Sequence, residues 1–163
     1  MKLYETPESK VLLQRELIEK AIHWRAGNKK IVFTNGCFDI LHPGHIYSLT
    51  QASKEGDYLV VGINADISVK KLKGKDRPIN NESSRALIVA SLAMVDAVCI
   101  FSDETPLELI KSFLPDVLVK GGDYSVDQIA GAKEVIAAGG KVVLNPILDG
   151  FSTTSIIHKL ITG

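Results

Sequence analysis

Two histidines lie three residues apart at a point where a short apolar run gives way to an amphipathic one. They belong to the run His42-Pro43-Gly44-His45. Pro43 suits the first position of a helix, where its missing N–H costs nothing, and Gly44 leaves the surface bare for a ligand. The free N–H groups at a helix N-terminus attract phosphate. The spacing therefore predicts a phosphate site that contains two imidazole groups.

Two further roles are open to the same histidines. They can be ordinary residues at a helix start, one capping the helix and one packed against it. They can also bind zinc, although helical zinc pairs usually have a spacing of four and a further ligand. No further ligand is evident beside His42 and His45 in the sequence. Cys37, just upstream, has no paired base in the sequence, so we interpret it as a small packed residue and not as a nucleophile.

Three consecutive hydroxyl side chains form a second candidate phosphate site. Ser152, Thr153 and Thr154 follow Gly150 and precede an apolar run. One such residue is an ordinary helix N-cap. Three of them at a helix N-terminus can also surround a phosphate.

Five of the eight residues 70–77 are basic, in a chain whose charge is balanced. A solvated loop is the simplest interpretation. A mobile loop that closes over bound phosphates is the functional one, since it gives a local positive field. Lys73 is our candidate for charge stabilisation and Lys71 for binding an acceptor phosphate. Arg85, on the next predicted helix, either binds the acceptor phosphate through its guanidinium group or lies on the surface.

A glycine turn follows a later apolar run, in the segment Lys120-Gly121-Gly122-Asp123. The glycines suit a tight turn, and they also let a base or ribose approach the backbone. Asp123 then offers a hydrogen-bond acceptor. Asp39 likewise has a functional and a structural role open to it, because it can bind a ligand or hold its own loop through local hydrogen bonds.

Predicted strands alternate with predicted helices along most of the chain. The strands cover residues 30–33, 58–63, 97–101, 117–119 and 142–144, and the helices cover 42–54, 83–94, 105–114, 127–138 and 152–161. This order predicts an α/β, Rossmann-like, doubly wound parallel sheet of about five strands with helices on both faces. Ligands bind beyond the carboxyl ends of such strands, where the candidate residues fall. Residues 1–28 are expected to form a helical extension packed on a domain of residues 29–163.

The composition narrows the class of protein. Among 163 residues, Lys and Arg total 19 and so do Asp and Glu, so the net charge does not indicate a nucleic-acid partner. The two cysteines lack a CxxC spacing, and the N-terminus lacks the apolar region of a signal peptide. No apolar run approaches the ~18 residues of a membrane span. We expect a cytoplasmic protein, and apolar residues on exposed helix faces would allow a homodimer.

The two phosphate motifs resemble those of the HxGH nucleotidyltransferase superfamily. The resemblance implies that His42 and His45 contact the phosphates of a nucleotide and stabilise charge as its α-phosphoryl group is attacked. It implies that the hydroxyl run binds the β- and γ-phosphates. The full predicted nucleotide site comprises Asn35, Gly36, Cys37, Phe38, Asp39, His42, Gly44, His45, Lys120, Gly121, Asp123, Ser152, Thr153 and Thr154.

From residue 29 to residue 161 the chain looks like the heptose 1-phosphate adenylyltransferases, one domain of the bifunctional heptose kinase/adenylyltransferases. The likeness is carried by residues 33–39, 72–74, 77–78, 95–96, 105–106, 115–124 and 129–131, and by Gly150 together with residues 152–154. It implies that D-glycero-β-D-manno-heptose 1-phosphate and ATP react to give ADP-heptose and pyrophosphate for lipopolysaccharide synthesis. Mg²⁺ would be bound through the nucleotide phosphates, and a separate heptose kinase would supply the sugar phosphate. Phe151 stands where typical members carry Cys, and we expect it to serve packing.

Two alternatives remain open. Glycerol-3-phosphate-type cytidylyltransferases carry an Arg-Thr-Glu-Gly run where this chain has Ile147-Leu148-Asp149-Gly150, and Thr in place of Cys37. A non-catalytic nucleotide-binding module would bind ATP without releasing pyrophosphate. The intact histidine and hydroxyl motifs argue against such a module.

Overall fold

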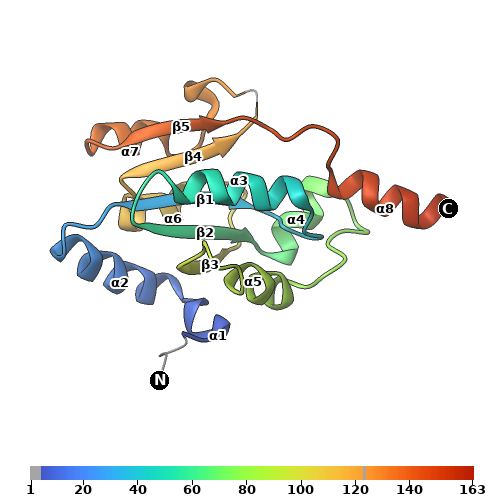
Figure 1. The fold of residues 1–163 in the computed structure, drawn as a ribbon, viewed down its shortest axis with the longest axis horizontal. Helices are drawn as coiled ribbons and strands as arrows, with labels where there is room; N and C mark the ends of the chain where they lie inside the picture. Colours follow the sequence, from blue (N-terminus) through green and yellow to red (C-terminus); the bar gives the residue numbers. More distant parts are fainter. Residues whose placement is uncertain (1–4, 123) are drawn as a thin grey trace.

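A five-stranded parallel sheet forms the centre of the computed structural model, which describes residues 5–122 and 124–163 (Figure 1). The strand order is β3-β2-β1-β4-β5, and every neighbouring pair is parallel. The strands are β1 (Ile31–Gly36), β2 (Tyr58–Asn64), β3 (Ala97–Phe101), β4 (Val117–Gly121) and β5 (Lys141–Asn145). The predicted Rossmann-like α/β fold is confirmed.

Helices cover both faces of this sheet. They are α1 (Pro7–Lys10), α2 (Gln14–Ala26), α3 (Pro43–Ser53), α4 (Asp66–Lys73), α5 (Glu82–Ala90), α6 (Leu107–Phe113), α7 (Ala132–Ala137) and α8 (Thr153–Thr162), with a short 3-10 helix, η1 (Val126–Gln128). One core contains buried side chains of α2, α6 and α7, and the other contains those of α3 and α5. The sheet therefore separates two apolar layers.

Alternation along the strands divides their side chains between these layers. In β1, Ile31 and Phe33 enter the core shared with α2, α6 and α7, whereas Val32 enters the opposite core. Successive side chains of a strand point to opposite faces, so an uninterrupted apolar strand can fill both cores. For this reason the strands read as continuous apolar runs.

The direction of winding reverses at β1. The chain passes from β1 outward to β2 and β3, then crosses back to place β4 on the other side of β1. The connections after β1 and β4 therefore leave the sheet in opposite directions. In open α/β sheets the crevice formed at such a point, beyond the carboxyl ends of the strands, is where ligands bind.

Three predicted segments differ from the structure. Residues 7–26 do not form one continuous helix, because Val11 is extended and pairs with Val98 of β3 between α1 and α2. The predicted helix at 127–138 is divided into η1 and α7. The basic run is not one loop, because residues 70–73 form the last turn of α4. Buried Val69 anchors α4 on the core. The lysines in the last turn of α4 made this segment look like a solvated loop in the sequence.

The N-terminal segment packs on the sheet through α2. Leu17, Ala21 and Trp24 are buried in the same core as Phe33. The division of the chain at residue 28 stays a prediction. Among the described residues, no helix combines the length and apolar character needed to cross a membrane.

Gly131 allows a test of the packing that separates η1 from α7. Its φ is +85°, and a Cβ there would lie 2.6 Å from Cδ1 of Ile110. Gly139 has a similar φ of +89° but open space around it, so it is a matched control. Gly131→Ala should therefore lower the free energy of unfolding by about 1–3 kcal/mol more than Gly139→Ala, the usual cost of overpacking. Equal losses in urea denaturation would contradict the packing contact.

Candidate active site

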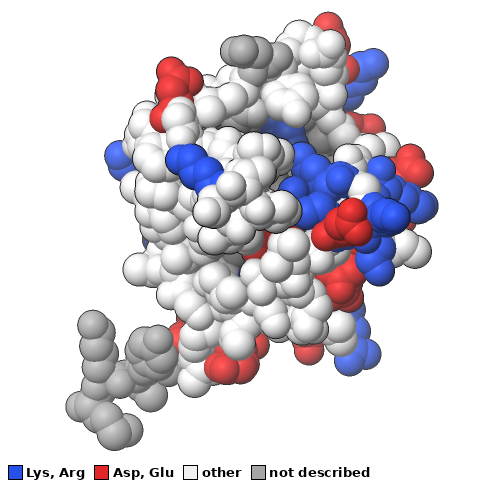
Figure 2. Space-filling view, turned by 90° about the vertical axis from the view of Figure 1, so that its right-hand side faces the viewer, with Lys and Arg blue, Asp and Glu red and all other residues white. Residues whose placement is uncertain are grey.

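A cavity of about 630 Å³ lies at the carboxyl ends of the strands, where β1, β2 and β4 end at Gly36, Asn64 and Gly121. Figure 2 looks onto this end of the molecule, where Lys and Arg side chains gather on one side of a hollow. The cavity is lined by twelve of the predicted site residues: Asn35, Gly36, Cys37, Phe38, Asp39, His42, His45, Lys73, Lys120, Ser152, Thr153 and Thr154. The sheet thus brings together two motifs that are about 110 residues apart in the chain.

The two histidines stack at the start of α3. Their ring centroids are 3.8 Å apart, with 26° between the planes. His42 is the N-cap, and its Nδ1 accepts a hydrogen bond of 3.1 Å from the backbone N–H of Gly44. In the neutral ring this bond assigns the hydrogen to Nε2, because only one of the two nitrogens carries it. His42 can therefore donate a hydrogen bond from Nε2.

Both histidines are neutral near pH 7. Burial lowers the pKa of His42, and burial together with the neighbouring His42 lowers the pKa of His45 to about 4. Nδ1 of His45 is buried and has no hydrogen-bond partner within the described part of the chain. The positive potential at this point therefore comes from the N-terminus of α3 and not from imidazolium charge.

Gly44 has a different role from the one its position suggests. It does not line the cavity. A Cβ on Gly44 would lie 2.9 Å from two ring atoms of His42. The glycine therefore leaves room for the capping imidazole, and its predicted role in nucleotide binding stays a prediction.

The start of α8 forms another part of the cavity wall that contains the histidine pair. Ser152 is its N-cap and accepts a hydrogen bond from Ser155 N–H at 3.0 Å. Thr153 donates to the carbonyl of Ile40 at 3.0 Å, which ties α8 to the loop after β1. Thr154, also in the cavity wall, makes no side-chain hydrogen bond within residues 5–122 and 124–163. Its hydroxyl is the one that remains for a ligand.

Phe151 is a cavity residue that sequence analysis assigned to packing. It lines the cavity and is 43% exposed. Its ring is nearly parallel to that of His42, at 15° and a centroid distance of 6.2 Å. Phe151 therefore forms part of the cavity wall beside the first histidine.

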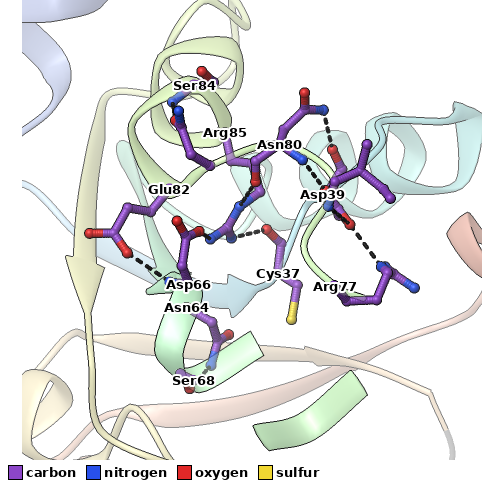
Figure 3. Close-up of polar contacts among 12 residues, drawn as sticks. Cys37, Asp39, Asn64, Asp66, Ser68, Arg77, Asn80, Glu82, Ser84 and Arg85 are labelled. Carbon is purple, nitrogen blue, oxygen red and sulfur yellow. Dashed lines mark hydrogen bonds and ion pairs between the residues drawn. The ribbon is translucent and has the colours of Figure 1, made fainter. Parts of the chain in front are cut away.

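Asp39 holds the loop after α4 (Figure 3). Its carboxylate accepts hydrogen bonds from Arg77 Nε at 2.8 Å and from the backbone N–H groups of Ile79 and Asn80, each at 2.9 Å. Burial alone would raise the pKa of Asp39, but the hydrogen bonds from Asn80, Ile79 and Arg77 lower it. The side chain is fully buried. The carboxylate of Asp39 therefore holds the loop, which was its alternative role, and its assignment to nucleotide binding stays a prediction.

Arg85 is a buried connector between three segments (Figure 3). Its side chain is 0% exposed and donates to the carbonyl of Cys37 at 2.6 Å, the carbonyl of Asn80 at 2.9 Å and the carboxylate of Asp66 at 2.8 Å. Both interpretations from the sequence are wrong, since Arg85 neither faces an acceptor phosphate nor lies on the surface. A buried guanidinium must be paired, and here the site's own backbone supplies the partners.

Burial also changes the ionisation of two cavity residues. It raises the pKa of the Cys37 thiol, so Cys37 is protonated at neutral pH, as expected of a residue that is not a nucleophile. It lowers the pKa of Lys120, whose Nζ lies 5.6 Å from the centre of the Tyr124 ring.

Besides Gly44 and Arg85, three further predicted site residues are not among those that line the main cavity. Lys71 is outside the cavity wall and pairs with Glu104 at 3.9 Å on the surface. Gly121 lines a smaller adjoining cavity. Asp123 lies outside the described residues, so its predicted role stays a prediction.

Several cavity residues were not predicted as site residues from the sequence. They are Asn64, Leu72, Arg77, Glu104, Thr105, Pro106, Tyr124, Gln128, Ile129, Ala130 and Phe151. Asn64 carried a usable signal, because it is the polar residue that follows an apolar strand. Most of the others lie in segments that carry the family resemblance or follow a predicted strand, but the sequence assigned them no role in the site.

Comparison with known proteins agrees with this geometry. Residues 33–159 match the model of the cytidylyltransferase-like family. The chain belongs to this family. Within the described residues of this cytidylyltransferase-like chain, no group of three or more His, Cys, Asp or Glu side chains could hold a metal ion.

Similar curated proteins are longer than this cytidylyltransferase-like chain. The bifunctional protein HldE of Koribacter versatilis is 55% identical over 152 residues, which are 93% of this chain and 31% of that protein. HldE of Rhodospirillum rubrum is 52% identical over 149 residues, 91% of this chain and 29% of that protein. The chain therefore spans about a third of the length of these relatives.

A solved structure shares the fold. The lipopolysaccharide core biosynthesis protein of Thermoplasma volcanium superposes with a TM-score of 0.59 at 30% identity, covering 74% of this chain and 97% of that one. The resemblance inferred from the two phosphate motifs is thus confirmed at the level of the family.

The buried role of Arg85 can be tested against the acceptor role. Arg85→Met removes the guanidinium and leaves Asp66 and two carbonyls without their donor, so it should lower the free energy of unfolding by about 3 kcal/mol. Arg15→Met, on the exposed side of α2, is the control and should change stability by less than about 0.5 kcal/mol. An unchanged urea midpoint for Arg85→Met would contradict the structural role.

His45 should make stability depend on pH. Its pKa falls from the ordinary 6.5 to about 4 on folding, so the unfolded chain binds more protons between these values. The stability that neutral His45 contributes above pH 6.5 should therefore be lost as the pH falls toward 4. His45→Phe should show a smaller loss over this window in denaturation at several pH values. His158→Phe, an exposed control on α8, should keep the wild-type slope.

Proposed function

We propose that this chain transfers the adenylyl group of ATP to D-glycero-β-D-manno-heptose 1-phosphate, giving ADP-heptose and pyrophosphate. The observation that carries the proposal is the shared cavity of the stacked His42–His45 pair and the α8 N-terminus. The sequence resemblance to heptose 1-phosphate adenylyltransferases supports the choice of substrates, and so do the similar proteins named for HldE and for lipopolysaccharide core biosynthesis.

The proposed reaction is a single in-line displacement. A phosphate oxygen of the sugar 1-phosphate attacks the α-phosphorus of ATP, the new oxygen–phosphorus bond forms, and the bond to the β-phosphate oxygen breaks as pyrophosphate leaves. Phosphoryl transfer of this kind depends on positioning and charge stabilisation more than on covalent catalysis. No enzyme-bound intermediate is required, which agrees with a protonated Cys37.

The residues then have distinct roles in the proposal. Nε2–H of His42 donates to a phosphoryl oxygen. His45, stacked beside it, also stabilises the charge that develops on the phosphate. The N-termini of α3 and α8 face the triphosphate, with Thr154 as the available hydroxyl. Lys73, on the cavity wall, stabilises charge at the reacting phosphates, and Lys71, also in the last turn of α4, binds the acceptor phosphate.

The nucleoside of ATP is proposed to lie over the carboxyl ends of β1 and β4, beside Asn35, Gly36 and Lys120. Mg²⁺ belongs in this scheme to the MgATP substrate, because the described carboxylates offer no cluster for it and Asp39 is already bonded within the protein. The acceptor requires a kinase that phosphorylates C1 of the sugar. We propose a separate kinase, a cytoplasmic enzyme and a homodimer as further parts of the same scheme.

Cytidylyl transfer is the second candidate, and the match to the cytidylyltransferase-like family favours it. The absence of the Arg-Thr-Glu-Gly run before Ser152 favours ATP. Pyrophosphate release with ATP and CTP, each combined with heptose 1-phosphate and glycerol 3-phosphate, separates the two. Release only with CTP and glycerol 3-phosphate would replace the first proposal, and nucleotide binding without release would indicate a non-catalytic module.

The histidine pair is the sharpest target within this assay. His45→Ala should lower kcat by about 10²- to 10³-fold, the cost of losing one charge-stabilising donor in a preorganised site. His158→Ala, which changes a histidine outside the cavity wall, is the control and should retain wild-type turnover. Circular dichroism should show that both variants are folded. Near-normal turnover by His45→Ala would contradict its catalytic role.

A further inference from the structure

Asn64 is a buried polar residue on the cavity wall that the proposed reaction does not use. It is the last residue of β2, is 3% exposed and lines the cavity. β2 pairs with β1 on the side away from β4, with Ile63 opposite Gly36, so Asn64 lies on the β2 side of the strand ends assigned to the nucleoside. Thr105 and Pro106, which follow β3, and Lys73 of α4 line the same cavity.

A chain of hydrogen bonds determines which way the carboxamide of Asn64 faces. The Ser68 hydroxyl donates to the carbonyl of Asp103 at 3.2 Å. The amide nitrogen of Asn64 donates to Ser68 Oγ at 3.1 Å (Figure 3). A carbonyl can only accept, so Ser68 uses its single hydrogen there and must accept from Asn64. The nitrogen side of the carboxamide is therefore held toward α4.

This orientation leaves the carboxamide oxygen for the cavity. Oδ1 of Asn64 has no hydrogen-bond partner within the described residues, and Asn64 lines the cavity. A carboxamide oxygen only accepts hydrogen bonds, so its ligand must present a donor. An ionised phosphate has none, whereas a sugar hydroxyl does.

We infer that Asn64 determines specificity for the acceptor by accepting a hydrogen bond from one hydroxyl group of the sugar phosphate. The inference rests on the proposed function, which places the nucleoside over β1 and β4 and leaves the part of the cavity beside β2 and β3 for the acceptor. The fixed carboxamide distinguishes an acceptor with a hydroxyl at that place from one without it. A site built to pair with a hydroxyl discriminates strongly against the deoxy analogue, because the protein group is then left unpaired.

The test compares heptose 1-phosphate with a set of analogues that each lack one hydroxyl group. Wild-type kcat/KM should fall on the order of tenfold or more for one of these analogues, the scale of one hydrogen bond to a buried group. Asn64→Leu should reduce this discrimination to about twofold or less, whereas Asn64→Asp, which keeps an acceptor oxygen, should retain it. General damage to the fold lowers both rates and leaves their ratio unchanged, so the ratio reports on the hydrogen bond.

Asn145→Leu is the matched control. Asn145 is also a buried asparagine at the end of a strand, and its amide nitrogen donates to the carbonyl of Ser48 at 3.2 Å, but it does not line the cavity. Its variant should keep the wild-type discrimination. Unchanged discrimination in Asn64→Leu would overturn the inference. If Asn64→Leu instead loses discrimination against 2′- or 3′-deoxy-ATP, the inference is also overturned. The hydroxyl that Asn64 binds would then belong to the ribose of the nucleotide.

Calorimetric binding of heptose 1-phosphate and its analogues separates this inference from the proposed function. If wild-type protein releases no pyrophosphate, the proposed activity is wrong. Asn64 is then judged by binding alone, where Asn64→Leu should weaken the hydroxyl-bearing sugar phosphate about tenfold and the critical deoxy analogue by about twofold or less. Equal weakening of both ligands, or no binding of either to wild-type protein, would overturn the inference.

Discussion

The buried guanidinium of Arg85 is the interaction on which the geometry of the site depends. It joins the carbonyl of Cys37, the carbonyl of Asn80 and the carboxylate of Asp66, so it holds the loop after β1, the loop after α4 and the start of α4 together. A guanidinium buried without such partners would carry a large desolvation cost. The segments that supply its partners are therefore coupled. Because Arg85 holds the start of α4, it also helps to position the lysines at the end of that helix.

A second constraint is the neutrality of the histidines. Stacking His45 beneath His42, against Phe38, removes it from water and lowers its pKa to about 4. Two imidazolium ions could not stack at 3.8 Å without strong repulsion, whereas neutral rings can offer oriented N–H donors. The site therefore combines neutral donors with the N-termini of α3 and α8 and with lysines at its edge. Such donors need little rearrangement when charge develops on a phosphate.

The reversal of winding at β1 gives one cavity two chemically different sides. On the side of β4 and α8 lie hydroxyls and the half-buried Lys120. On the side of β2 lie Asn64, held by Ser68, and Lys73 at the end of α4. A reaction between two bound substrates requires such a division, with the reacting phosphates over β1 between them. The fold supplies it because β2 and β3 lie on one side of β1 and β4 and β5 lie on the other.

The sequence alone determined the alternation of strands and helices and the two phosphate motifs, because apolar periodicity, proline and glycine positions and hydroxyl runs are local signals. The break at Val11 was not predictable, because pairing with Val98 overrides local preference. Tertiary structure alone decided the roles of the polar residues. Asp39 and Arg85 read as ligand-binding groups but are bonded to backbone far away in the chain, whereas Phe151 reads as packing but faces the cavity. A side chain's type states which bonds it can make, and only the fold determines which partners are close enough to make them.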